Sequence, residues 1–257
     1  MKHLFFLVFI SVCLLSHAGE HQLSVVSEHW PPYIIHYKND TVQAEVKGVV
    51  TENIREILAL ANLDYSLNIY PWARSYHLAT NKPNVLIYSI FKNEQREPLF
   101  HWFCPVYQAT PIRIFKLATN SADISSLASL KNSVVGVMRD DNSYRYLSTK
   151  GFEPGVNLDI SSNEEINLLK LITGKIDAVV QSEAALRYRL AQVNASNLAI
   201  VAGLTLHSKE KTEHCMALSK NSDAQLINKI STAFAQWQAN ATHADSNNTD
   251  AQFSNLR

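Results

Sequence analysis

The sequence lacks the short motifs that identify the common enzyme classes. Its 257 residues contain no G-x-S-x-G, H-E-x-x-H, C-x-x-C, G-x-G-x-x-G or phosphate-binding loop. Histidines are numerous, ten in all, but none belongs to such a motif. We therefore predict that the protein is not an enzyme and that it has no catalytic residues, no metal and no cofactor.

An excess of charge of one sign is also absent. The chain has 23 lysines and arginines against 23 aspartates and glutamates, and no basic stripe interrupts this balance. Binding to nucleic acid or to an anionic membrane surface requires clustered positive charge. The composition therefore argues against both kinds of partner.

Long apolar runs are missing except at the N-terminus. Lys2 and His3 precede an apolar run over residues 4–15, and Ser16-His17-Ala18 places small residues at a cleavage site. This pattern predicts a secretory signal peptide over residues 1–18, which is too short to span a bilayer. The remaining chain is expected outside the cytoplasm and not embedded in a membrane.

Cysteine is scarce. Of three cysteines, Cys13 lies in the predicted signal peptide, so Cys104 and Cys215 remain in the mature chain. An even number of cysteines in an oxidising compartment suggests one disulfide. Two buried free thiols are the alternative.

What the chain does have is an alternation of short apolar runs and helical patterns, which is typical of α/β architecture. Val50, Ile54, Ile57 and Leu58, for example, fall on one face of a helix. Ser162 with Glu165 three residues later predicts a capping box at a helix start. About 240 residues suffice for one large domain or two modest lobes.

Two segments resemble a known family. Residues 84–107 (NVLIYSIFKNEQREPLFHWFCPVY) read as a strand, a polar turn with Arg96, and a second strand, and residues 164–185 read EEINLLKLITGKIDAVVQSEAA. Both resemble periplasmic solute-binding protein family 3, which has the type II periplasmic binding fold. The resemblance covers essentially the whole mature chain.

The resemblance implies two lobes, each a mixed sheet flanked by helices, joined by two hinge crossings. Lobe 1 would comprise residues 19–106 and 214–240, lobe 2 residues 107–213, and residues 241–257 would form a polar, disordered tail. Cys104 and Cys215 would lie beside the crossings, where a bridge between them is sensible.

The resemblance also implies a ligand site between the lobes. Arg96, with Ser89, would hold a ligand carboxylate, because a guanidinium donates two parallel hydrogen bonds to one carboxylate. Trp30 would stack over the ligand. Further predicted ligand-binding residues, from both lobes, are Tyr33, Trp72, Arg74, Tyr88, Arg139, Asp141, Asn142 and Ser182.

The chain departs from the family pattern at two places. Asp140, Asp141 and Asn142 stand where the family uses Gly with Thr or Ser to bind a carboxylate. Ser182 stands where binders of α-amino acids place an Asp against the ligand ammonium. A buried ammonium is costly without a counter-charge, so these residues argue against the usual α-amino-acid mode. Ser182 is alternatively a plain helix cap.

The expected function is that of a periplasmic, monomeric solute-binding protein. It would close two lobes on a small polar ligand, amino-acid-like or carboxylate, and deliver it to an inner-membrane ABC permease. One alternative is a stand-alone periplasmic sensor that acts through a membrane receptor. Another is a dehydratase-like enzyme on the same fold, with Asp141 or His29 as acid or base.

Overall fold

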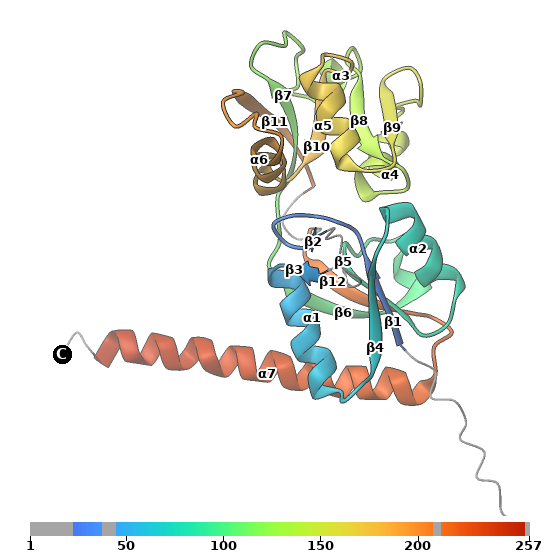
Figure 1. The fold of residues 1–257 in the computed structure, drawn as a ribbon, viewed down its shortest axis with the longest axis vertical. Helices are drawn as coiled ribbons and strands as arrows, with labels where there is room; N and C mark the ends of the chain where they lie inside the picture. The colour runs from blue at the N-terminus through green and yellow to red at the C-terminus, as the bar shows by residue number, and fades with distance from the viewer. Residues whose placement is uncertain (1–22, 38–44, 208–211, 255–257) are drawn as a thin grey trace, which may run out of the picture.

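The computed structural model describes residues 23–37, 45–207 and 212–254. The predicted signal peptide, residues 1–18, lies outside these ranges. Within them, no helix combines the length and the apolar character needed to cross a membrane. The chain forms two lobes, drawn one above the other in Figure 1, and each lobe is built on its own five-stranded sheet.

The sheet of the first lobe has the strand order β4-β1-β5-β12-β6. Strands β4, β1 and β5 are parallel, and β12 runs antiparallel between β5 and β6, so the sheet is mixed. A short two-stranded sheet, β2 with β3, lies beside it. The elements of this lobe are β1 (Leu23–Ser27), β2 (Ile35–Tyr37), β3 (Glu45–Lys47), α1 (Val49–Leu60), β4 (Tyr65–Ile69), α2 (Trp72–Asn81), β5 (Val85–Ile90), η1 (Glu97–Leu99), β6 (Phe100–Tyr107), β12 (His214–Ser219) and α7 (Ala224–Ser254).

The sheet of the second lobe has the order β11-β7-β10-β8-β9 and is also mixed. Strands β10, β8 and β9 are parallel, and β7 is antiparallel to both of its neighbours. The elements of this lobe are β7 (Ile112–Leu117), α3 (Leu127–Leu130), β8 (Val135–Met138), α4 (Asn142–Thr149), β9 (Leu158–Ser161), α5 (Glu164–Ile172), β10 (Ala178–Gln181), α6 (Glu183–Gln192) and β11 (Ile200–His207). The predicted α/β class with two mixed sheets is confirmed.

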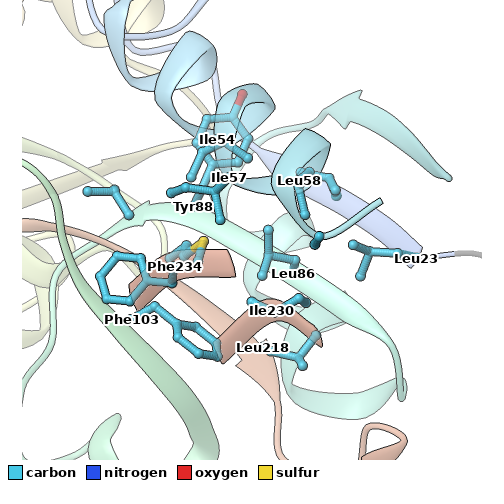
Figure 2. Close-up of a cluster of buried hydrophobic side chains, with 14 of the residues drawn as sticks. Leu23, Ile54, Ile57, Leu58, Leu86, Tyr88, Phe103, Leu218, Ile230 and Phe234 are labelled. Atoms are coloured by element: carbon cyan, nitrogen blue, oxygen red, sulfur yellow. The ribbon is translucent and has the colours of Figure 1, made fainter. Parts of the chain in front are cut away.

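The predicted apolar face of α1 anchors the first lobe. Val50, Ile54, Ile57 and Leu58 are all fully buried, and they pack with residues of the sheet and of α7. Figure 2 shows this core, in which Ile230 and Phe234 of α7 lie near Leu86 and Phe103. Burying such side chains stabilises a fold by roughly 1.5–3 kcal/mol each.

The two crossings between the lobes lie next to each other. The chain leaves the first lobe after β6 and returns as β12, and the Thr110 N–H donates to the Thr212 carbonyl oxygen at 3.1 Å. A Cys104–Cys215 disulfide joins β6 to β12 on the first-lobe side of these crossings. The predicted disulfide is therefore confirmed, and the free-thiol alternative is wrong.

The C-terminal tail requires a correction. Residues 241–257 are expected to be disordered, but α7 continues to Ser254 and projects beyond the first lobe in Figure 1. The sequence between residues 224 and 254 contains no glycine or proline that would end a helix. Polarity alone therefore did not identify the end of this helix.

Candidate functional site

A cavity lies between the two lobes and encloses about 550 Å³ of space outside protein atoms, part of it open solvent. Its walls come from the ends of parallel strands and the starts of the following helices, where side chains of neighbouring units converge. The first lobe contributes Glu28, Trp30, Trp72, Ser89, Phe91 and Arg96. The second lobe contributes Ile112, Met138, Asp141, Asn142, Ser143, Glu164, Val180, Gln181, Ser182 and Arg189.

Arg96 borders this cavity with only 1% of its surface exposed. One terminal nitrogen donates to the Phe91 carbonyl oxygen at 3.2 Å, and the other donates to the Asp140 carbonyl oxygen at 3.5 Å. The rings of Trp72 and Tyr76 lie 5.1 Å from the guanidinium carbon. The buried Nε has no hydrogen-bond partner, and no ion pair within the described residues reaches Arg96.

Burial lowers the pKa of Arg96 from its ordinary value, because a charged guanidinium loses its hydration inside the protein. Nearby Tyr76 and Asp141 act in the opposite direction. The protein thus holds a positive group that its own side chains leave incompletely neutralised. An anion that entered the cavity could accept a hydrogen bond from the Arg96 guanidinium.

Trp30 borders the cavity and has one ring face covered. The ring of His214 stacks on it at a centroid distance of 4.8 Å with an interplanar angle of 13°. Phe91 meets Trp30 edge-on at 5.6 Å, and Tyr33 does so at 5.1 Å. Because aromatic rings pack against Trp30 on several sides, its side chain has little freedom to move. A ring held in place in this way is what stacking over a ligand would require.

Ser89 is the last but one residue of β5, and it has a left-handed backbone with φ of 60°. Its hydroxyl is hydrogen-bonded to His214 Nδ1 at 2.6 Å. His214 Nε2 in turn meets the Thr110 hydroxyl at 2.9 Å. The Ser89 hydroxyl is therefore engaged by the hinge, although the residue lines the cavity.

Two of the predicted second-lobe residues act as helix caps. Asp141 caps α4 by accepting from the Tyr144 N–H, and Ser182 caps α6 by accepting from the Ala185 N–H at 3.3 Å. Asn142 bridges the lobes, because its side-chain oxygen accepts from Asn93 Nδ2 at 2.9 Å. All three still border the cavity, so the capping and ligand-binding interpretations of Ser182 are compatible.

The acidic side chains at the cavity have perturbed pKa values. Burial is the main cause in each case: it raises the pKa of Asp141 to about 6 and that of Glu164 to about 7. Burial, followed by the charge of Glu164, raises the pKa of Glu28 well above its ordinary value. Such shifts favour the neutral acid until a positive partner arrives.

Glu28, Glu164 and Arg189 were not predicted from the sequence. Glu28 directly follows β1, in the loop whose aromatic residues were the ones predicted to bind ligand. Glu164 opens α5, whose cap is Asn163 and not the predicted Ser162, so the helix begins with Glu164 in its first turn. Arg189 lies on α6, where a basic residue in the last turn resembles an ordinary surface position.

The structure places Tyr33, Arg74, Tyr88 and Arg139 away from the cavity lining. Tyr88 points to the opposite face of β5 from Ser89, since side chains alternate along a strand, and it lies in the core shown in Figure 2. Its hydroxyl is hydrogen-bonded to Thr51 Oγ1 at 3.1 Å. Tyr33 is buried against Trp30. Arg74 and Arg139 are exposed, and the Arg74 guanidinium lies over the Tyr70 ring at 4.1 Å.

Direct contacts hold the lobes together around the cavity. The Trp72 Nε1–H donates to the Asp140 carbonyl oxygen at 2.9 Å, and Arg189 donates to the His29 carbonyl oxygen at 3.0 Å. Each bond joins one lobe to the other. The structure is therefore a closed form, in which the cavity is narrow and both walls are within reach of one small ligand.

Solved structures of other proteins have a similar fold. The sensor domain of a histidine kinase, described as similar to periplasmic binding proteins, matches with a TM-score of 0.72 and 17% identity over 88% of this chain and 93% of its own. The chain has the two-lobed fold of the periplasmic binding proteins. No family model matches the sequence, and no curated protein matches it either.

Two further structures with this two-lobed fold were solved with bound arginine. An ancestral arginine-binding protein matches with a TM-score of 0.71 and 20% identity, over 87% of this chain and 95% of its own. An amino acid ABC transporter substrate-binding protein from Streptococcus pneumoniae matches with a TM-score of 0.68 and 17% identity, over 87% and 91%. Identity at this level establishes the fold and leaves the ligand open.

Proposed function

We propose that the protein is a periplasmic solute-binding protein that closes two lobes on a small polar ligand, amino-acid-like or carboxylate, for ABC-type import. Arg96 anchors the acidic end of the ligand, and Trp30 covers an apolar or flat part of it. Asp141, Asn142 and Ser182 complete the site from the second lobe. The protein works as a monomer, without catalysis, and passes the ligand to an inner-membrane permease.

One observation carries this proposal: the buried Arg96 forms no ion pair among the described residues, is incompletely hydrogen-bonded, and borders a cavity between two lobes. A charge buried without a partner costs several kcal/mol, so proteins rarely keep one without a use. A ligand carboxylate would supply both the missing charge and acceptors for the free donors. Such charge-assisted bonds are roughly twice as strong as neutral ones.

Closure follows from the same geometry. A ligand that contacts Arg96 in one lobe and the start of α4 in the other stabilises only the closed form, which shifts an open–closed equilibrium. The interlobe bonds from Trp72 and Arg189 add to the closed state in the same way. The adjacent crossings, tied by Thr110 and Thr212, supply the hinge.

The similar structures support an amino-acid-like ligand and an import role, because they include ABC transporter substrate-binding proteins with bound arginine. The histidine kinase sensor domain favours a second candidate, a periplasmic sensor that signals through a membrane receptor. Deletion of the gene separates the two. Loss of ligand uptake supports transport, whereas unchanged uptake with loss of a ligand-dependent transcriptional response supports sensing.

A thermal-shift screen tests the binding function. Amino acids, small carboxylates, amines and short peptides are each added to the purified protein, because a ligand that binds the native state raises the melting temperature. Any ligand found should then bind Arg96→Ala at least about 30-fold more weakly, since removing one member of a buried charge pair costs 2 kcal/mol or more. Chemical analysis of the recovered ligand would detect turnover by a dehydratase-like enzyme.

Arg74→Ala is the matched control, because Arg74 is an exposed arginine of the same lobe outside the cavity lining. Its binding should match that of the unmodified protein. Equal binding by Arg96→Ala would refute the anchoring role of Arg96, and a screen without any hit would count against solute binding as such.

A further inference from the structure

His214 lies at the point where the chain returns from the second lobe to the first. It is the first residue of β12, and its side chain is fully buried. Four aromatic rings surround its imidazole at centroid distances from 4.8 to 5.8 Å, those of Trp30, Tyr33, Phe91 and Tyr107. A polar ring in such a place depends on a few fixed hydrogen-bond partners, because a buried polar group is costly without them.

Two buried hydroxyl groups are these partners. Nδ1 is hydrogen-bonded to the Ser89 hydroxyl at 2.6 Å, and Nε2 is hydrogen-bonded to the Thr110 hydroxyl at 2.9 Å. Ser89 lines the cavity, whereas Thr110 lies between β6 and β7, in the crossing that leaves the first lobe. The ring thus joins a residue of the cavity to a residue of the hinge.

The protonation state of the ring links the directions of these two bonds. Burial lowers the pKa of His214 to about 3, so the imidazole is neutral near neutral pH. A neutral imidazole has one N–H donor and one bare nitrogen that accepts. One of the two hydroxyls therefore accepts from the ring while the other donates to it, and reversing one bond reverses the other.

The direction decides what the Ser89 hydroxyl offers to a ligand. Within the described residues, this hydroxyl has no hydrogen bond besides the one to His214. If Nδ1 carries the proton, it donates to Ser89, and the Ser89 hydrogen stays available for an acceptor in the cavity. If Nε2 carries the proton, Ser89 donates to Nδ1 and offers only lone pairs. An anionic group bound at Arg96, which borders the same cavity, needs donors, so only the first arrangement suits it.

We propose that His214 is a positioning residue of the binding site: its ring, protonated on Nδ1 and accepting from the Thr110 hydroxyl at Nε2, orients the Ser89 hydroxyl to donate to the acidic group of the ligand. The inference rests on the proposed solute-binding function and adds a residue that acts on the ligand through another. It also connects ligand recognition to closure. A hinge rotation that moved Thr110 away from Nε2 would remove the bond that keeps the proton on Nδ1.

Nuclear magnetic resonance of the ring nitrogens tests the tautomer directly. A protonated and a bare imidazole nitrogen differ clearly in chemical shift, and the His214 signals are assigned through bonds from the backbone in protein with isotope-labelled histidine. The probe is the tightest-binding compound among L-arginine, L-glutamate and succinate, or a carboxylate found in the thermal-shift screen. With the probe bound, Nδ1 should be protonated and Nε2 bare. A protonated Nε2 with a bare Nδ1 overturns the proposal.

Thr110→Val tests the role of the ring in binding. The substitution removes the hydroxyl at Nε2 and keeps the shape of a side chain that lies outside the cavity lining. A ring with only a structural role would leave the affinity for the probe unchanged. The proposal predicts binding weaker by about threefold to tenfold in isothermal titration, the effect of one hydrogen bond. Ser89→Ala added to Thr110→Val should bind the probe as Ser89→Ala alone does, because the same donor is lost, and additive losses would overturn the coupling.

Thr51→Val is the matched control. Thr51 is also a buried threonine of the first lobe outside the cavity lining, and its hydroxyl is hydrogen-bonded to another side chain, that of Tyr88, at 3.1 Å. The variant therefore loses a buried hydroxyl of the same kind without touching His214. Its affinity for the probe should stay within about twofold of that of the unmodified protein.

Unchanged affinity of Thr110→Val would overturn the proposal and leave solute binding intact. The tautomer measurement uses the unmodified protein and decides the matter should Thr110→Val fail to fold. Failure of the unmodified protein to bind any probe or screened compound has a different meaning. It refutes the proposed function and with it the inference, so the two failures are distinguishable.

Discussion

The hydroxyl of Ser89 is hydrogen-bonded to Nδ1 of His214 at 2.6 Å, and this bond connects the cavity to the hinge. Ser89 lines the cavity, and His214 is the first residue of the strand that returns from the second lobe. The same imidazole stacks on the ring of Trp30 and is hydrogen-bonded to the hydroxyl of Thr110 in the other crossing. The imidazole of His214 thus connects Ser89, which would contact the ligand, to both crossings between the lobes.

Ser89→Ala should lower the free energy of unfolding by about 1–3 kcal/mol, because it leaves the buried His214 Nδ1 without a partner. Urea unfolding measures this change. Ser231→Ala removes an exposed hydroxyl that bonds only within α7 and should change stability by less than about 0.5 kcal/mol. Equal stability of the two variants would show that the Ser89–His214 bond contributes little.

Arg96→Met should leave the ligand-free protein as stable as before, or more stable. The substitution removes a buried, incompletely paired charge and keeps an unbranched side chain between Trp72 and Tyr76. Binding sites often reduce stability in this way, so their removal is stabilising. Thermal unfolding without ligand checks the expectation, and a large drop in melting temperature would mean that Arg96 has a structural role.

Glu164 should make the stability of the ligand-free protein depend on pH. Its pKa is raised to about 7 by burial, against the pull of Arg189, so the native state binds its proton more tightly than the unfolded state does. That contribution is complete below about pH 4.5 and is lost as the pH rises through about 7. Asp141 also raises this pKa, while Asn167 and Gln181 lower it.

Glu164→Gln isolates this effect. The melting temperature of the variant minus that of the unmodified protein should be larger at about pH 8 than at about pH 5. The difference cancels titrating groups that do not interact with Glu164, including His214, whose pKa burial lowers to about 3. A difference that does not change with pH would show that Glu164 ionises normally.

Trp72→Phe should loosen the closed form. It removes the N–H that donates across the lobes to Asp140 and retains an aromatic ring beside Tyr76 and Arg96. One such bond contributes roughly 0.5–1.5 kcal/mol, which is enough to change an open–closed ratio several-fold. Small-angle scattering of the ligand-free variant should give a larger radius of gyration, and an unchanged radius would contradict a role for this bond in closure.

Reduction of the Cys104–Cys215 disulfide should destabilise the fold while leaving the site intact. The bridge spans a sequence separation of 111 residues, and native disulfides typically contribute about 2–4 kcal/mol. Neither cysteine lines the cavity, so ligand affinity should stay within threefold in a Cys104→Ser/Cys215→Ser double variant. Unfolding and titration of this variant separate the two effects, and a large loss of affinity would place the bridge in the binding mechanism.

Several features of the site were predictable from local sequence. Arg96 follows a polar turn between two apolar runs, and Trp30 follows the first strand beside two prolines, so both were expected near strand ends. That both would face a ligand was implied by the resemblance to the family. Local sequence did not show that Tyr88 and Tyr33, unlike Arg96 and Trp30, lie outside the cavity lining. Tyr88 and Ser89 are both buried, and what separates them is which face of β5 packs in the core with α1 and which borders the cavity.

The sequence by itself determined the elements of this protein, because apolar periodicity, helix caps and two cysteines are local signals. Only the tertiary structure decided the charge of the cavity. Glu28 and Glu164 look like ordinary surface acids in the sequence, and they border one cavity because residues more than a hundred positions apart meet where the two lobes close. These acids are buried only where the two lobes come together. Their burial, and the free-energy cost of an unpaired charge there, therefore cannot be read from either segment alone.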